Sequence, residues 1–179
     1  MPYLLPVCQG LLVVVFFASA ASKLRGGQAL RAFATSLTEM GLVRHTHERL
    51  VAAAIAGAEA VVVLLLVIPF TRDAGFAGAA VLLVVLSAGV ARVLARGTAR
   101  PCRCFGASSV PLSPRHLIRN ILLTAVALAG FVTPAGTQPV AASIVALLGG
   151  ALAGFLVTAL DDVIDLFTPN RSEEARWRT

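Results

Sequence analysis

The chain has little charge. Only 13% of its 179 residues are Asp, Glu, Lys or Arg, whereas 58% are hydrophobic, and its mean hydropathy is +0.86. Ordinary soluble domains of this length do not have such a composition. No polar stretch is long enough for a separate soluble domain, and neither a Gly-rich phosphate-binding loop nor a serine-hydrolase signature is present. The absence of these features excludes a soluble enzyme with a phosphate-binding loop and a soluble serine hydrolase.

Long apolar runs take the place of polar sequence. A helix needs about 20 mostly apolar residues to cross ~30 Å of hydrocarbon. Five runs meet this requirement, at residues 4–21, 50–69, 74–94, 117–133 and 141–160. The sequence therefore predicts an all-α, polytopic helical bundle over residues 1–160 in a lipid bilayer, followed by a charged tail at 161–179.

The first run lacks the basic residues that precede the apolar part of a signal peptide. Residues 1–9 hold neither Lys nor Arg, and the first positive charges, Lys23 and Arg25, come after the run. We therefore expect residues 4–21 to be a membrane span and not a cleaved signal peptide.

Basic residues are concentrated on one side of the predicted spans. Arg72 is alone in the loops of the opposite side. The positive-inside rule then predicts an outside N-terminus and a cytoplasmic C-terminus, in what we expect to be a bacterial plasma membrane. The same bias explains the net charge of +6 without a nucleic-acid partner. The basic side holds twelve such residues: Lys23, Arg25, Arg31, Arg44, Arg49, Arg96, Arg100, Arg103, Arg115, Arg171, Arg176 and Arg178.

A pair of cysteines lies in the predicted cytoplasmic connection between the third and fourth spans. Cys102 and Cys104 flank Arg103 in the segment Pro-Cys-Arg-Cys-Phe-Gly at 101–106. Thiols at this spacing close only a small, strained disulfide ring, which would exchange readily. A neighbouring cation such as Arg103 favours the thiolate. A reducing cytoplasm favours catalytic, sensing or metal-binding cysteines over a permanent disulfide. The alternatives are two unpaired cysteines or half of a metal site.

Polar residues also occur inside the spans. Glu59 lies near the middle of the second span, roughly 13 Å along the helix, and Arg119 and Asn120 enter the fourth from the cysteine side. An ionisable group at such depth is costly and normally has a partner or a function. Two interpretations stay open: a structural ion pair between Glu59 and Arg119, or a contact to protons or a quinone.

The connection over residues 22–49 is too long for a turn. Leu30, Phe33, Leu37 and Met40 recur at spacings of three and four, which predicts a short amphipathic helix at the membrane surface. It would be an interfacial packing helix or a lid over the cysteine segment.

The other candidate ligands give weaker patterns. His45, His47 and His116 match no familiar zinc spacing, so no metal site is assigned. Cys8 lies at the opposite end of the first span from the cysteine pair, and we expect it to serve packing.

The fifth span carries a face of small residues. Gly149, Gly150, Ala153 and Gly154 follow the small-xxx-small pattern that lets helices approach closely. This face predicts tight contact, either within the bundle or between two copies of the chain.

Several of these elements together resemble the MauE branch of the DoxX-like membrane proteins, over about residues 5–133. They are Lys23 closing the first span, Glu59 in the second, the 101–106 segment, and Arg119 with Asn120. The resemblance implies a four-helix core, here with a fifth C-terminal span, and a redox-associated role beside thioredoxin-like proteins in the maturation of other proteins. Arg103 stands where a Gly is usual.

These observations lead to one hypothesis and one rival. The hypothesis is a membrane-embedded thiol–disulfide redox protein, in which one of Cys102 and Cys104 attacks and the other resolves a mixed disulfide. Arg103 would favour thiolate; Lys23, Glu59, Arg119 and Asn120 would support the site. The partner would be thioredoxin-like or linked to a quinone. The rival is a non-enzymatic scaffold whose cysteine segment docks a partner or binds metal.

Overall fold

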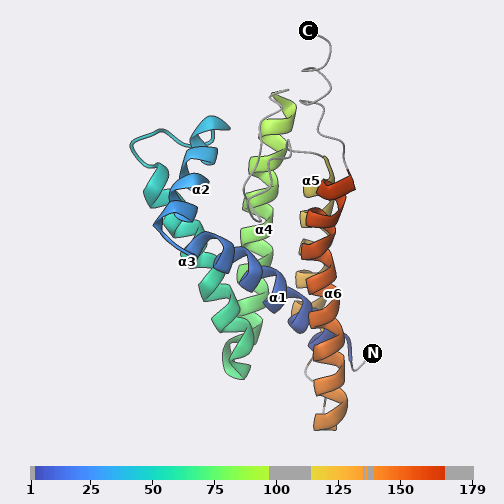
Figure 1. Cartoon of the computed structure of the whole chain (residues 1–179). Helices are drawn as coiled ribbons and strands as arrows, with labels where there is room; N and C mark the ends of the chain where they lie inside the picture. Colours follow the sequence, from blue (N-terminus) through green and yellow to red (C-terminus); the bar gives the residue numbers. More distant parts are fainter. Residues whose placement is uncertain (1–2, 97–113, 135, 137–138, 168–179) are drawn as a thin grey trace.

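The computed structural model describes residues 3–96, 114–134, 136 and 139–167, with side chains as far as residue 159. Within this part all regular elements are helices, and there is no strand. Figure 1 shows the helices along the chain. They are α1 (Leu4–Leu24), α2 (Gly27–Glu39), α3 (Glu48–Val67), the 3₁₀ turn η1 (Pro69–Thr71), α4 (Arg72–Ala95), α5 (Pro114–Val132) and α6 (Val140–Phe167).

The prediction of five membrane-spanning helices is confirmed. In the described part of the chain, α1, α3, α4 with η1, α5 and α6 are long and apolar enough to cross a membrane. The protein is thus an integral membrane protein with a helical bundle. The predicted fifth span, 141–160, agrees with the apolar part of α6, Val140–Ala159, and the helix continues to Phe167.

A proline sets the turn between α3 and α4. The residue before a proline is kept out of the α-helical region by steric contact with the ring. Ile68, which precedes Pro69, is accordingly extended, with φ −81° and ψ 121°, and α3 ends there. The chain then reverses through η1 directly into α4.

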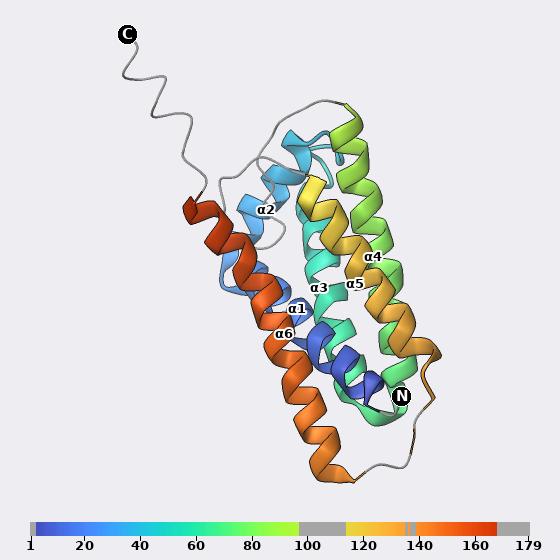
Figure 2. The ribbon, with the colours of Figure 1, turned by 90° about the vertical axis from the view of Figure 1, so that its right-hand side faces the viewer.

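Helix α1 is the centre of the bundle. It packs against α6, α3, α5 and α2. Half of the residues in its apolar stretch are buried, a larger share than in any of the other four spans. Figures 1 and 2 show it crossing the bundle obliquely, with α6 on one side and α3, α4 and α5 on the other. The remaining spans leave wide apolar surfaces exposed, as expected of helices that face lipid.

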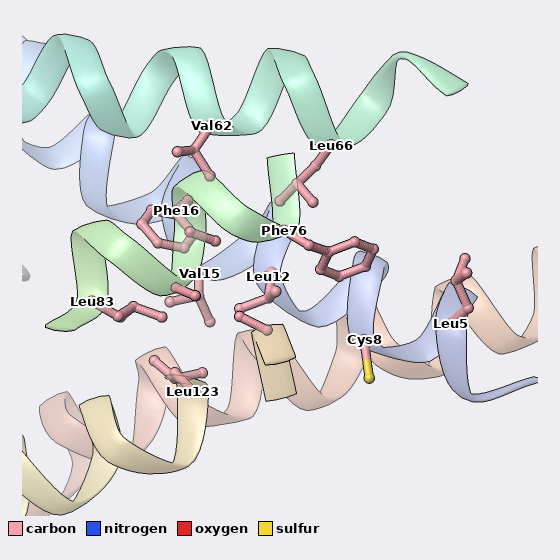
Figure 3. Close-up of a cluster of buried hydrophobic side chains, with 13 residues drawn as sticks. Leu5, Cys8, Leu12, Val15, Phe16, Val62, Leu66, Phe76, Leu83 and Leu123 are labelled. Atoms are coloured by element: carbon pink, nitrogen blue, oxygen red, sulfur yellow. The ribbon is translucent and has the colours of Figure 1, made fainter. Parts of the chain in front are cut away.

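The main apolar core lies where α1, α3, α4 and α5 meet. Phe76 of α4 is fully buried beside Leu12 of α1 and Leu66 of α3 (Figure 3). Cys8 belongs to the same cluster and is buried in it. The expectation that Cys8 serves packing is therefore confirmed.

Glycines bring the backbones of α1 and α6 into direct contact. A Cβ at Gly150 would collide with the backbone of Val7, one at Gly154 with Leu11, and one at Gly10 with Leu147. The small-residue face of the fifth span is therefore used within the bundle. A Cβ at Gly149 would meet no atom within 4 Å, so Gly149 lies on a different side of α6 from Gly150 and Gly154.

The predicted amphipathic helix is α2, confirmed over Gly27–Glu39. Its apolar residues are not only directed at lipid. They form a second buried cluster with the start of α3 and the end of α4. This cluster is built from Phe33, Ala34, Leu37, Met40, Ala52, Val90 and Val93.

The glycine contact between α1 and α6 gives a matched pair of variants. Gly150→Leu should lower the melting temperature in detergent by several degrees, because the new side chain must push α6 off α1 and overpacking of this kind costs about 1–3 kcal/mol. Gly149→Leu, one position away and facing open space, should leave it unchanged or slightly higher. Equal melting temperatures for the two variants would contradict the described α1–α6 contact.

A buried ion pair as the candidate functional site

Lys23 and Glu59 form an ion pair inside the bundle. Lys23 lies in the last turn of α1, and Glu59 lies in the middle of α3. The Lys23 Nζ donates to both carboxylate oxygens of Glu59, at 2.7 Å to Oε1 and 2.8 Å to Oε2. The two residues are 2% and 1% exposed. Both charges are thus withdrawn from solvent and directly compensated.

Ser19 completes the network. It lies one turn before Lys23 on the same face of α1, accepts a hydrogen bond from the Lys23 Nζ at 2.7 Å, and donates one to Glu59 Oε1 at 3.0 Å. The hydroxyl therefore lies between ammonium and carboxylate as both acceptor and donor. Charge-assisted hydrogen bonds of this length are the strong class. The network fixes the end of α1 against the middle of α3.

The intact ion pair contributes little net free energy to folding, whereas removing one of its two partners is strongly destabilising. Withdrawing two ions from water costs several kcal/mol each, which their mutual attraction roughly offsets when the geometry is good. Removing one partner leaves an uncompensated buried charge and typically costs about 3–5 kcal/mol. Lys23 also lies in the last turn of α1, where the helix dipole favours a cation. The pair is therefore held firmly once formed.

Helix α2 covers the ion pair. The ring of Phe33 lies 5.0 Å from the Lys23 Nζ, at cation–π distance, and Phe33 itself is buried. Lys23 thus has a carboxylate on one side and an aromatic face on another. The sequence predicted that α2 is either an interfacial packing helix or a lid over the cysteine segment. In the structure it lies over the network of Lys23, Ser19 and Glu59.

The predicted pairing of Glu59 with Arg119 is wrong. The Glu59 carboxylate is taken by Lys23 and Ser19. Helix α5, which carries Arg119, packs against α4 and α1 rather than α3. Helices α3 and α5 are therefore not neighbours. The buried partner of Glu59 is Lys23, which the sequence analysis counted among the basic residues at the membrane surface.

Asn120, which the sequence placed at the entrance of the fourth span, is buried. It is 3% exposed, on the face of α5 that packs into the bundle, and its side-chain oxygen has no hydrogen-bond donor in the described part of the chain. An unsatisfied buried polar atom costs about 1–3 kcal/mol. Asn120 is thus a polar group held in the protein without a described partner.

The cysteine pair and Arg103 lie outside the described residues. The helices on either side are described: α4 ends at Ala95 and α5 begins at Pro114. The end of α4 contacts the loop after α2, since Arg96 donates to the Gly41 carbonyl at 3.3 Å, and Leu117 of α5 packs on the α2 cluster. The chain that carries Cys102 and Cys104 therefore leaves and rejoins the bundle at the end where α1 finishes with Lys23.

The histidines form no metal-binding group in the residues that the structure describes. There, no three His, Cys, Asp or Glu side chains come together. His45 is exposed and its Nδ1 lies 3.2 Å from Glu48 Oε2, which also accepts a hydrogen bond from Thr38 at 2.7 Å. This is a surface contact between the α2–α3 loop and the start of α3.

Ser19 is the functional candidate that sequence reasoning missed. Its signal is the four-residue spacing to Lys23 at the end of an apolar run, which puts both on one helix face. Serine is common in apolar helices, so that spacing alone does not indicate a buried network.

One known protein family matches the part of the chain that contains the buried ion pair. The family model described as methylamine utilisation protein MauE matches residues 1–133, which include α1 to α5 and the buried pair. The chain belongs to the MauE family. No curated protein and no solved structure matches it. Helix α6 lies beyond the part matched to MauE.

The ion pair predicts how single and double variants behave. Lys23→Met should lower the free energy of unfolding by about 3–5 kcal/mol, because Glu59 is left buried and uncompensated. The double variant Lys23→Met/Glu59→Leu should recover most of that loss, since no charge then remains in the bundle. Unfolding in detergent, followed by circular dichroism, measures both.

Glu48→Gln, at the partly exposed start of α3, is the control and should change the free energy of unfolding by less than about 1 kcal/mol. If the double variant were as unstable as the sum of the two single variants, Lys23 and Glu59 would not be paired.

Proposed function

We propose that this MauE-family protein is a membrane-embedded thiol–disulfide redox protein whose reacting groups are Cys102 and Cys104. One thiolate attacks a disulfide of a thioredoxin-like partner and the other thiol resolves the mixed disulfide; in the reverse direction a partner thiolate attacks the Cys102–Cys104 disulfide and the partner's second thiol resolves it. Arg103 favours the thiolate form. The reaction supports the maturation of other proteins, within methylamine utilisation as the family's description has it.

The proposed exchange is balanced without a further reagent. In one direction, the dithiol of Cys102 and Cys104 becomes a disulfide while the partner's disulfide becomes a dithiol, so two electrons and two protons pass between the proteins. In the other direction the roles reverse. A quinone-linked partner would return the pair to its starting state by accepting or donating the same two electrons and two protons.

The observation that carries the proposal is the buried network at the end of the bundle from which the cysteine segment leaves. Lys23, Ser19 and Glu59 maintain charge and hydrogen bonds there under the cover of α2, and Asn120 adds a buried acceptor on α5. Charged groups at such depth are retained at functional sites far more often than on lipid-facing surfaces. We assign Lys23, Glu59, Arg119 and Asn120 as positioning residues.

The orientation belongs to the same proposal. The distribution of Lys and Arg supports an outside N-terminus and a cytoplasmic cysteine segment in a bacterial plasma membrane. In that arrangement the thiols react on the reducing side, so the partner is a cytoplasmic protein with a thioredoxin-like disulfide.

Trapping of a mixed disulfide tests the chemistry. With one of Cys102→Ser and Cys104→Ser, a thioredoxin-like partner should remain covalently attached, because the resolving thiol is gone; the other variant should trap far less. Non-reducing gel electrophoresis followed by mass spectrometry of the adduct measures this. Cys8→Ser should behave as the unchanged protein, since Cys8 is buried in the apolar core.

Two results would overturn the redox proposal. One is that both thiols stay reduced over the whole range of a dithiol redox titration. The other is that the purified protein retains stoichiometric zinc. Either result would favour the rival, a scaffold whose cysteine segment docks a partner.

Thiol labelling tests the orientation separately. A membrane-impermeant maleimide added to intact cells of the Cys8→Ser variant should not label Cys102 or Cys104, and labelling should appear once the membrane is opened. Labelling in intact cells would place the cysteine segment outside and make exported proteins the direct substrates.

A further inference from the structure

A cavity of about 340 Å³ lies at the other end of the bundle from the ion pair. It is formed by the first turns of α1, the first turns of α6 and Arg72 at the start of α4. Its walls are mostly apolar, with Leu5, Ile144 and Leu147 among them. This volume is at the lower end of the range for small-molecule sites, about 300–1,000 Å³.

Helix α6 is the element that makes this cavity. Half of its lining residues, from Val140 to Leu148, belong to α6, which lies beyond the residues matched to the MauE family. The glycine contacts hold α6 against α1 just below the cavity, because Gly150 meets Val7. The MauE core without α6 would leave this part of α1 facing lipid.

Arg72 is the charged group in the lining, and its position is not explained by the fold alone. Its Nε is buried and has no hydrogen-bond partner. That Nε forms an ion pair with Asp73 Oδ1 at 3.6 Å, which is beyond hydrogen-bond distance; the Arg72 side chain is 20% exposed and the Asp73 side chain 73%. Arg72 is also the first residue of α4, where the helix dipole disfavours a cation.

Gln9 and Ser143 add polar atoms, and both already bond to the backbone. Gln9 Nε2 donates to the Leu66 carbonyl at 2.7 Å, and Ser143 Oγ donates to the Pro139 carbonyl at 3.4 Å. The guanidinium of Arg72, whose side chain is 20% exposed, is the charged donor among these lining residues. A planar guanidinium recognises phosphate and carboxylate groups in particular.

We propose that this cavity binds an acyl lipid with an anionic headgroup, with the phosphate or carboxylate on Arg72 and the chain along Leu5, Ile144 and Leu147. The apolar walls match a hydrocarbon chain, and the single cation matches one anionic group. The site is independent of the cysteine chemistry, because it lies at the opposite end of the bundle.

Native mass spectrometry of the full-length protein, released from detergent after incubation with defined lipids, tests the proposal. Phosphatidylglycerol should be retained about tenfold more than phosphatidylcholine of the same chains, and Arg72→Gln should remove most of that preference, as expected for loss of a charge-assisted contact. Oleate, used in a separate arm, distinguishes a free fatty acid from a phospholipid as the source of the anionic group.

Two further variants make the result specific. Ser143→Phe keeps Arg72 but fills the cavity, so it should lose the retained lipid even if Arg72→Gln folds poorly. Arg31→Gln, an exposed arginine on α2, removes the same charge elsewhere and should retain phosphatidylglycerol as the unchanged protein does. Melting curves establish that each variant is folded.

The proposal is overturned if folded Arg72→Gln or Ser143→Phe retains phosphatidylglycerol and oleate at the level of the unchanged protein. It is also overturned if phosphatidylcholine is retained equally well. Retention of oleate alone, lost in both variants, would support the site and identify its ligand as a fatty acid.

Discussion

The rest of the structure depends on the compensation of one buried charge by another. An isolated carboxylate at the depth of Glu59 would be too costly in a membrane, so α3 occupies that position only while Lys23 meets it. That contact fixes the register of α1 against α3 through Ser19 and both carboxylate oxygens. Helix α2 then lies over the pair with Phe33 against the ammonium. The electrostatic contact thus defines the packing of α1, α2 and α3 around the buried pair.

The sequence predicted the helices well because hydrophobic length alone selects membrane spans. It also predicted the amphipathic pattern of α2, because apolar residues at spacings of three and four have few other uses at a membrane surface. The partner of Glu59 could not be predicted in this way, since it depends on which spans pack together. The positive-inside rule counts Lys23 as a surface charge, yet its side chain reaches back along α1 into the bundle. The continuation of α6 beyond its span, to Phe167, was not predicted, because three Asp residues follow the apolar run.

The two ends of the bundle differ in their chemistry. At one end, charge and hydrogen bonds are closed off by α2, next to the helices that flank the cysteine segment. At the other end, Arg72 lies among apolar side chains in a cavity that α6 completes. The family match covers α1 to α5 at both ends, and α6 lies beyond it. An added C-terminal helix has therefore changed the surface of the bundle far from the residues that carry the MauE resemblance.

The contact between α1 and α6 has a consequence for biogenesis. Helices α1 and α6 are separated in the chain by three other spans, α3, α4 and α5, yet their backbones touch at Gly10, Gly150 and Gly154. During synthesis the surface of α1 around Gly10 must therefore stay covered by lipid or by an insertion factor while those three spans enter the membrane. Arrival of α6 then displaces that temporary occupant. If synthesis stopped before α6, this surface of α1 would remain exposed to lipid.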